Sequence, residues 1–209
     1  MTRLPFLTLA WISLLLVSGC RSKPEVATEV APCCRKPLTN TPASDRSLFQ
    51  LDSEWTSDLG KTIRLGTLRG HPQVVALFFS HCEFACPLLV ARMKAIEGAF
   101  PPSGRNDAEF LLVSIDPDRD TPAALHEYRA RQGLSLRRWT LLTGSAGSVR
   151  ELAALLGVQY QRDARGQYAH SNLLTILNAE GEVVHQSSGL RAEVDDLVAA
   201  VVRLSPPAH

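Results

Sequence analysis

The sequence predicts an α/β protein in which a central mixed β-sheet is flanked by helices. Three observations support this fold class. Continuous apolar runs alternate with helical patterns along the chain, two cysteines stand between the first of these runs and the helix that follows it, and the chain closes with a β-hairpin and a helix. Strands that alternate with helices are typical of a layered sheet with helices on both faces.

The folded part begins with a predicted N-terminal β-hairpin. Residues 46–70 alternate loosely between apolar and polar and contain the turn signal SDLGK, so strands are expected in FQLDSEW and TIRLGTL. Residues 74–79 form a continuous apolar run, which is typical of a buried central strand. The helix predicted next carries apolar residues at helical spacing: Leu88, Leu89, Met93, Ile96 and Phe100.

Two further buried strands are expected at residues 110–116 and 139–144. Between them, Thr121 as N-cap and Pro122 at the first helical position predict a helix that ends at Gly133. Another helix is expected to end at Gly157. The segments SNLLTILN and EVVHQSS then form a hairpin around AEGE, and AEVDDLVAAVVRL closes the chain as a helix. With the cysteine pair after the first buried strand, this order predicts a thioredoxin-like fold.

Residues 1–19 are predicted to be a lipoprotein signal peptide. One early arginine precedes an apolar run that is shorter than the roughly 20 residues of a membrane span, as in a secretory signal. The end of this segment, VSGC, resembles the bacterial lipobox, in which cleavage leaves a lipid-modified cysteine, here Cys20. A lipid on Cys20 would anchor the protein to a membrane outside the cytoplasm. A plain signal peptide or a short anchor is the alternative.

Residues 20–45 read as a flexible tether and residues 46–209 as the thioredoxin-like domain. The tether is rich in Pro, Ser, Thr and charge and has no apolar period. Its adjacent Cys33 and Cys34 are too close for a relaxed disulfide with each other. They could form disulfides with other cysteines, bind a soft metal ion, or be incidental thiols. With Lys+Arg 22 against Asp+Glu 21 and no basic block, no nucleic-acid partner is expected.

The stretch SHCEFACP, residues 80–87, contains the two cysteines that are candidates for redox or metal-binding chemistry. Because proline is tolerated only near the start of a helix, Pro87 places Cys86 at or just before that start and Cys82 in the loop leading in. The positive end of the helix dipole favours thiolates there. Three residues separate the cysteines, instead of the two of a thioredoxin-type C-x-x-C. This spacing permits a disulfide bond, and it also lets both sulfurs converge on one metal ion.

A soft ion held by two thiolates needs a third donor, and His170 is the candidate. It precedes the strand LLTIL, at the place where thioredoxins put a cis-proline that faces the cysteine loop. Met93 lies on the apolar helix stripe and is assigned to the core. The remaining histidines are assigned to the surface or to structural roles: His71, His81, His126, His185 and His209.

Together, CEFACP, VSIDPDRDTP and AHSN resemble the SCO/SenC family of copper-binding proteins, over roughly residues 47–203. The resemblance implies one copper ion, Cu(I) or Cu(II), bound by Cys82, Cys86 and His170. It implies Asp116 as a partner of the ligands or as a contact to a client. Two thiolates and an imidazole suit copper, whereas structural zinc prefers four protein ligands.

The resemblance also implies a role. Family members help to assemble the copper centre of cytochrome c oxidase subunit II, by delivering copper or by reducing its cysteines. A membrane-anchored metallochaperone in the bacterial periplasm is therefore expected, with subunit II or another extracytoplasmic copper protein as client. Two departures weaken the client assignment more than the copper site: Glu83-Phe84 stands where many members have Pro-Asp, and Ala169 where many have Asp.

An enzymatic role is the alternative, so whether the protein is an enzyme stays open. Cys82 and Cys86 would then be the redox-active pair of an extracytoplasmic thiol–disulfide oxidoreductase. A copper or redox sensor and a thiol peroxidase are further alternatives, although no arginine lies within the motif loop to activate a peroxidase. His170 discriminates between the two main hypotheses, since a reductase does not require it and the copper site does.

Overall fold

The computed structural model describes residues 44–100, 108–164, 166–191 and 193–204. The predicted signal peptide, Cys20, Cys33 and Cys34 lie outside these residues. Within the described ranges, no helix has both the length and the apolar character needed to cross a bilayer.

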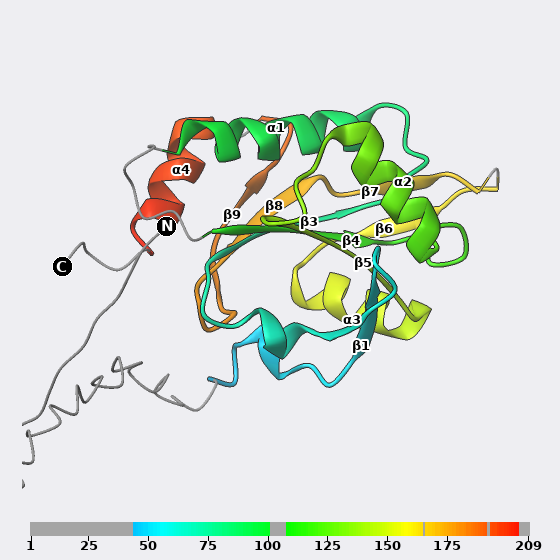
Figure 1. The fold of residues 1–209 in the computed structure, drawn as a ribbon, viewed down its shortest axis with the longest axis horizontal. Helices are drawn as coiled ribbons and strands as arrows, with labels where there is room; N and C mark the ends of the chain where they lie inside the picture. The colour runs from blue at the N-terminus through cyan, green and yellow to red at the C-terminus, as the bar shows by residue number, and fades with distance from the viewer. Residues whose placement is uncertain (1–43, 101–107, 165, 192, 205–209) are drawn as a thin grey trace, which may run out of the picture. The chain divides into compact units, whose positions relative to one another are not determined.

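Seven strands form one mixed sheet in the order β2-β1-β5-β4-β3-β8-β9 (Figure 1). The strands are β1 (Glu54–Ser57), β2 (Thr62–Arg64), β3 (Gln73–Phe78), β4 (Glu109–Ser114), β5 (Trp139–Gly144), β8 (Leu173–Leu177) and β9 (Val183–Ser188). The three central strands β5, β4 and β3 are parallel, while β1–β2 and β8–β9 are antiparallel additions at the two sides. All six residues of β3 are buried, as its continuous apolar run predicts.

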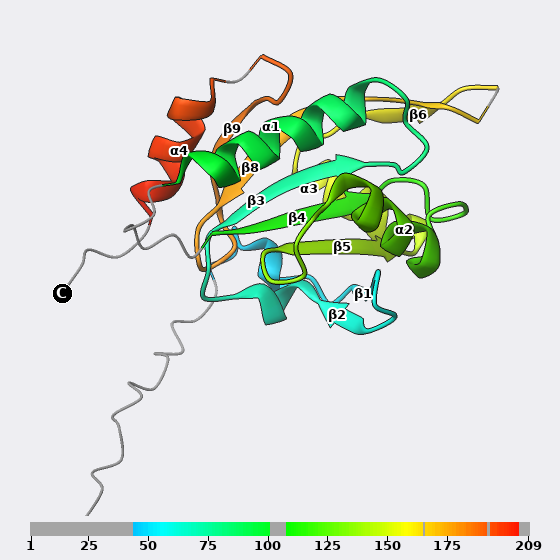
Figure 2. The same cartoon turned by 45° about the horizontal axis from the view of Figure 1, so that its top comes forward.

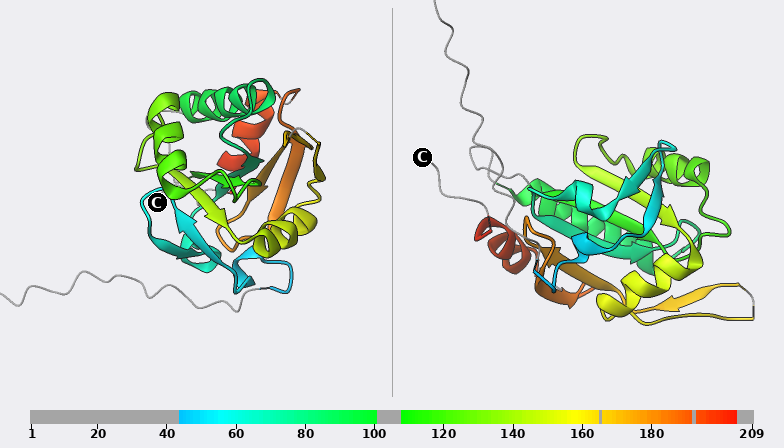
Figure 3. Two further views of the ribbon diagram at one scale, coloured as in Figure 1. Left: turned by 90° about the vertical axis from the view of Figure 1, so that its right-hand side faces the viewer. Right: turned by 90° about the horizontal axis from the view of Figure 1, so that it is seen from below.

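Helices cover both faces of the sheet, as expected. They are α1 (Ala85–Ala99), α2 (Pro122–Gln132), α3 (Ala146–Leu155) and α4 (Val194–Val202). Figures 1 and 3 show α1, α2 and α4 on one face and α3 on the other. The steps from β3 to β4 and from β4 to β5 advance in the same direction, so right-handed crossovers put α1 and α2 on the same face. After β5 the chain passes back across the sheet to β8, and α3, which lies on this return, covers the opposite face of the sheet. This is the predicted thioredoxin-like α/β fold.

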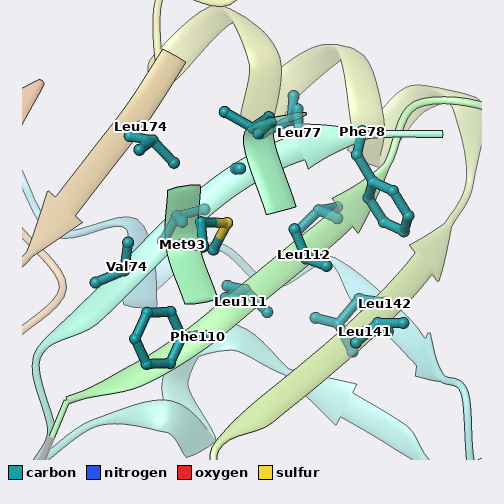
Figure 4. Close-up of a cluster of buried hydrophobic side chains, with 14 of the residues drawn as sticks. Val74, Leu77, Phe78, Met93, Phe110, Leu111, Leu112, Leu141, Leu142 and Leu174 are labelled. Carbon is teal, nitrogen blue, oxygen red and sulfur yellow. The ribbon is translucent and has the colours of Figure 1, made fainter. Parts of the chain in front are cut away.

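One part of the core lies between α1 and the central strands (Figure 4). Met93 is fully buried there, as predicted, and so are Leu89 and Ile96. Leu88 was expected on the same apolar stripe, but its side chain is 62% exposed, so that expectation is wrong. Leu88 is adjacent to Leu89, and one residue turns a helix by about 100°, which carries Leu88 off the buried face.

Local signals located most helix ends correctly. Thr121 caps α2 by accepting a hydrogen bond from the amide of Ala124, and Gly133 ends it in the left-handed conformation at φ 62°. The N-terminal hairpin is shorter than predicted: residues Leu48–Gln50 and Leu65–Leu68 form the 3-10 helices η1 and η2 instead of strand. The sequence also gave no sign of a second, two-stranded sheet, made of β6 (Tyr160–Arg162) and β7 (Tyr168–His170).

A buried ion pair ties α2 to the sheet. The Arg129 guanidinium donates to both carboxylate oxygens of Asp58, at 2.9 Å from Nη2 to Oδ1, and Nη2 also donates to the carbonyl of Trp139. Both side chains are almost inaccessible to water. The pair joins the β1–β2 turn, α2 and β5, so it fixes the helix that follows the Asp116–Asp120 loop.

We expect Arg129→Ala to lower the free energy of unfolding by about 3–5 kcal/mol, because Asp58 would be left as an uncompensated buried charge. Urea denaturation followed by circular dichroism measures this. Arg131→Ala is the matched control, since its ion pair with Glu127 is exposed and contributes little. Equal losses in the two variants would contradict the assignment.

Candidate metal centre

The cysteine loop follows the carboxyl end of β3. The amide of Cys82 donates to the carbonyl of Phe79 at 3.3 Å, which closes a turn. Cys86 is the second residue of α1, and its amide donates to the sulfur of Cys82 at 3.3 Å. Pro87 follows within the first turn, where its missing N–H leaves no helical hydrogen bond unmade. Both cysteines therefore lie at the helix start, close to where the sequence places them.

His170 reaches this loop from the end of β7. Its Nε2 lies 3.5 Å from the sulfur of Cys86, although the two residues are 84 positions apart. Its Nδ1 lies 3.2 Å from the carbonyl oxygen of Ser171. A carbonyl only accepts hydrogen bonds, so Nδ1 carries the proton of the neutral ring. The lone pair of Nε2 therefore points to the sulfur, which is the arrangement that a metal-binding imidazole requires.

Aromatic packing orients the imidazole of His170. The Phe79 ring meets the His170 ring edge-on, with centroids 5.9 Å apart, and it packs against Tyr168 at 5.5 Å. Tyr168 and His170 lie two residues apart on β7, so their side chains share one face of the strand. Phe79 itself precedes the cysteine loop. One buried ring thus fixes the histidine and the loop relative to each other.

Burial sets the protonation states of the two residues in contact. Desolvation raises the pKa of the Cys86 thiol, and the nearby charges of Cys82 and Asp120 act in the same direction against an opposing hydrogen bond at Phe79. The expectation that the helix dipole favours a thiolate therefore fails at Cys86, because burial outweighs it. Desolvation also lowers the pKa of His170, against a smaller opposing effect of Ser171, so its ring stays neutral and able to coordinate.

The three predicted ligands are neighbours but do not form a closed cage. In the part of the chain that the structure describes, no three His, Cys, Asp or Glu side chains are gathered closely enough to hold an ion. Cys86 contacts His170, whereas the sulfur of Cys82 accepts the amide hydrogen of Cys86. Both cysteines are free thiols, Cys86 buried and Cys82 half-buried. Two sulfurs and one imidazole fit a soft ion such as Cu(I).

The predicted Asp116 is fully buried at the end of β4. Its Oδ2 pairs with Arg119, and its Oδ1 has no hydrogen-bond partner among the described residues. Arg119 in turn donates to the carbonyl of Gly166 at 2.7 Å. Asp116 therefore connects the β4–α2 loop to the turn between β6 and β7, the hairpin that carries His170. Its predicted role beside the ligands or towards a client stays a prediction.

Asp120 is the carboxylate that supports the cysteine loop, and sequence reasoning did not single it out. It is fully buried and accepts a hydrogen bond from the amide of Ser80 at 3.0 Å. It also accepts from the hydroxyls of Ser80 and Ser114. These bonds join the loop to β4. The available signal was its position after a neighbouring parallel strand, because the carboxyl ends of such strands meet at one edge of the sheet.

The surface beside the loop is apolar. Phe84, between the two cysteines, is 80% exposed, and Leu88 follows one turn later on α1. Leu88 lines a groove of about 310 Å³ between α1 and the turn after β9, together with Ala91, Arg92, Ala95, Gly189 and Leu190. Phe84 and Leu88 thus place exposed apolar side chains beside the predicted ligands Cys82 and Cys86.

Comparison with known proteins identifies the family. The sequence pattern of the SCO1/SenC family matches residues 42–205, so the chain belongs to that family. The SCO1 protein homolog of Bacillus subtilis (strain 168) is 25% identical over 146 residues, which are 68% of this chain and 75% of that protein. A relative from Stutzerimonas stutzeri is 28% identical over 123 residues, 56% of this chain and 58% of its own length.

Solved structures share the fold. A SCO1/SenC family lipoprotein from Bacillus anthracis str. Ames superposes with a TM-score of 0.68 at 24% identity, covering 75% of this chain and 95% of that one. Arabidopsis thaliana ScoI with copper bound superposes with a TM-score of 0.65 at 24% identity, covering 72% of this chain and 94% of that one. BsSco is a member of the Sco family of cytochrome c oxidase assembly proteins in which a disulfide switch was identified. Its structure superposes with a TM-score of 0.63 at 24% identity, covering 72% of this chain and 90% of that one.

Replacing Asp120 by alanine should loosen the cysteine loop while the sheet stays folded. The amide of Ser80 would lose a charge-assisted hydrogen bond of about 1.5–3 kcal/mol, so its hydrogen exchange should accelerate more than about tenfold. Amide exchange followed by NMR measures this. Asp118→Ala is the control, because Asp118 is an exposed carboxylate that pairs only with Arg162 in the described structure. Unchanged exchange at Ser80 in the Asp120 variant would show that Asp120 does not hold the loop.

Proposed function

We propose that this protein is a membrane-tethered, extracytoplasmic metallochaperone that carries one copper ion on Cys82, Cys86 and His170. The contact of 3.5 Å between Cys86 Sγ and His170 Nε2 is the observation on which the proposal rests. It joins a soft sulfur to a neutral imidazole from a distant part of the chain. Family membership supports the proposal, and so does the relative from Arabidopsis thaliana that was solved with copper bound.

The unequal burial of the two cysteines suits a carrier. Copper binding displaces a proton from each thiol, and the neutral imidazole needs no deprotonation. Cys86 is buried, whereas Cys82 and His170 are half-buried. An incoming ligand from a client would meet Cys82 or His170 before Cys86, so the ion would exchange through that side. A three-coordinate site leaves room for such a ligand.

The client is proposed to be subunit II of cytochrome c oxidase or another extracytoplasmic copper protein. BsSco, which shares the fold, belongs to a family of cytochrome c oxidase assembly proteins, and this supports the proposal. We further propose that Phe84 and Leu88 contact the client, because both are exposed beside the ligands. The Bacillus anthracis relative is a lipoprotein, which supports lipidation of Cys20 and a membrane-anchored place in the bacterial periplasm.

A thiol–disulfide oxidoreductase is the second candidate. The observation in its favour is that Cys82 and Cys86 are both free thiols, and that the backbone amide of Cys86 donates a hydrogen bond to the sulfur of Cys82. One thiolate would attack a client disulfide and release one client thiolate, and the second would resolve the mixed disulfide and release the other. The client would gain two electrons, and a Cys82–Cys86 disulfide would remain.

Copper titration separates the two functions. In a background with Cys33→Ser and Cys34→Ser, the protein should bind one equivalent of Cu(I) in competition with a chromophoric chelator. His170→Ala and Cys82→Ser should each weaken binding by more than about 100-fold, since loss of an outer-shell partner alone costs about 10–100-fold. His126→Ala, which changes an exposed histidine on α2, is the control. Parent-like copper binding by His170→Ala, with retained reduction of a small disulfide, would favour the reductase.

Truncation of the apolar surface tests the handover. We expect Phe84→Ser combined with Leu88→Ser to keep parent Cu(I) affinity but to slow copper transfer about 30-fold or more, since each apolar anchor contributes roughly 1–2 kcal/mol to an interface. Stopped-flow transfer to the soluble copper domain of a subunit II measures the rate. Leu155→Ser is the control, because Leu155 is exposed on α3 at the other face of the sheet. Equal transfer rates would remove this surface from the handover.

A further inference from the structure

A pocket of about 390 Å³ lies beside the hairpin that carries His170, on the α3 side of the sheet. This volume falls in the range of about 300–1,000 Å³ that is typical of small-ligand pockets. The loop after β4, the first turns of α3 and the β6–β7 hairpin line it. It shares no lining residue with the apolar groove between α1 and the turn after β9. Its charged side chains are Asp118, Arg150 and Arg162, and its walls include Val149, Tyr160 and Tyr168.

The charges in this pocket do not balance. Arg162 pairs with Asp118 at 3.3 Å, so one positive and one negative charge offset each other. Arg150 is exposed on α3 and has no ion-pair or hydrogen-bond partner among the described residues. The whole chain is nearly neutral, with Lys+Arg 22 against Asp+Glu 21, so the positive excess is local to the pocket. An unpaired guanidinium in a concave site favours a carboxylate from outside, which it can bind through two hydrogen bonds.

Arg162 is held in place before any ligand arrives. Its guanidinium carbon lies 5.7 Å from the centroid of the Tyr168 ring, and Asp118 pairs with it from the loop after β4. A Cβ at Gly166 would lie 3.5 Å from its Nη2, so the guanidinium also packs against the turn of the hairpin. The Tyr160 ring packs on Tyr168 with centroids 6.1 Å apart. The tyrosine rings and this guanidinium are therefore preorganised, which lowers the entropy lost on binding.

Ring contacts connect the pocket to the candidate metal centre. Tyr168 packs against Phe79 at 5.5 Å, and Phe79 meets the imidazole of His170 at 5.9 Å. Figure 2 shows the β6–β7 hairpin extending past the arrowheads of β3 and β4, at the end of the sheet where the cysteine loop begins. Phe84 and Leu88, the other proposed client contacts, belong to the cysteine loop and α1, and α1 and α3 cover opposite faces of the sheet. A protein that receives copper at this end would meet both surfaces.

We propose that this pocket is a docking site for an acidic segment of the client protein. The inference rests on the proposed function, since the occupant is the protein that receives the copper ion. A carboxylate of that segment pairs with Arg150, and an apolar or aromatic side chain beside it packs on Tyr160 and Tyr168. Complementary charge speeds the encounter and fixes the orientation of the client, so that its ligands face His170. No covalent bond, proton or electron is exchanged in the pocket.

Peptide binding to the metal-free protein tests the pocket directly. The probe is a capped peptide with one phenylalanine between two glutamates, and its matched control has glutamines instead. Titration followed by NMR should shift the resonances of Val149, Tyr160 and Tyr168, with a dissociation constant of about 1 mM. The glutamine peptide should bind at least about tenfold more weakly, because it offers no charge to the guanidinium.

Charge reversal identifies the arginine. Arg150→Glu should weaken binding of the glutamate peptide at least about tenfold, and Arg150→Ala, which removes the charge without reversing it, should weaken it less. Arg137→Glu is the matched control, because Arg137 is exposed two residues before β5, at the opposite end of the sheet. It carries the same change in net charge and should bind like the parent. In stopped-flow transfer to the soluble copper domain of a subunit II, Arg150→Glu should be about tenfold slower than Arg137→Glu.

Three results would overturn the inference: equal binding of the two peptides, parent-like binding by Arg150→Glu, or resonance shifts centred on Leu88 and Leu190 in the apolar groove. Inorganic phosphate that shifts the pocket residues as strongly as the peptide would make this a small-anion site instead. Shifts that appear when the protein alone is concentrated would make a second copy the occupant. Equal transfer rates in Arg150→Glu and Arg137→Glu would remove the client as the occupant. The peptide titration needs no copper, so a parent protein that binds no Cu(I) would overturn the proposed function and leave the peptide result standing.

Discussion

The contact between Cys86 and His170 is the constraint on which the proposed function depends, and the order of the central strands is needed to make it. β8 pairs with β3 in antiparallel register, so the beginning of β8 lies beside the end of β3. The cysteine loop follows the end of β3. His170, the last residue of β7, comes three residues before the beginning of β8, so both segments lie at the same end of the two strands. Strands β4 and β5 and their helices lie between the two segments in the chain. The site therefore forms only when the crossovers are complete.

Burial gives this site its chemical character. The same desolvation that keeps the Cys86 thiol protonated also keeps the imidazole neutral, so the metal-free site carries little charge in its buried half. In the proposed copper site, a soft cation would offset the cost of the buried thiolate that it creates. Asp120 holds the loop through Ser80, and Phe79 packs edge-on against the imidazole. Because Cys82 is half-buried, the proposed ion would stay accessible to a client.

Most of the fold could be predicted from local patterns, because its strands are continuous apolar runs and its helices have clear caps. Thr121 and Gly133 located α2, and the apolar run of β3 located the sheet centre. The short β6–β7 strands escaped because three-residue polar strands have no periodic signal. The proposed ligand triplet came from motif and family resemblance and stays a prediction. The protonation of Cys86 and the role of Asp120 could not be predicted, since burial and tertiary partners decide them.

The most direct test of the central claim is X-ray absorption spectroscopy of the purified protein loaded with one equivalent of Cu(I), in the background that lacks Cys33 and Cys34. The account predicts two sulfur scatterers and one nitrogen scatterer, with the multiple-scattering pattern of an imidazole that disappears in His170→Ala. A copper environment made of sulfur alone, or an imidazole pattern that persists without His170, would contradict it.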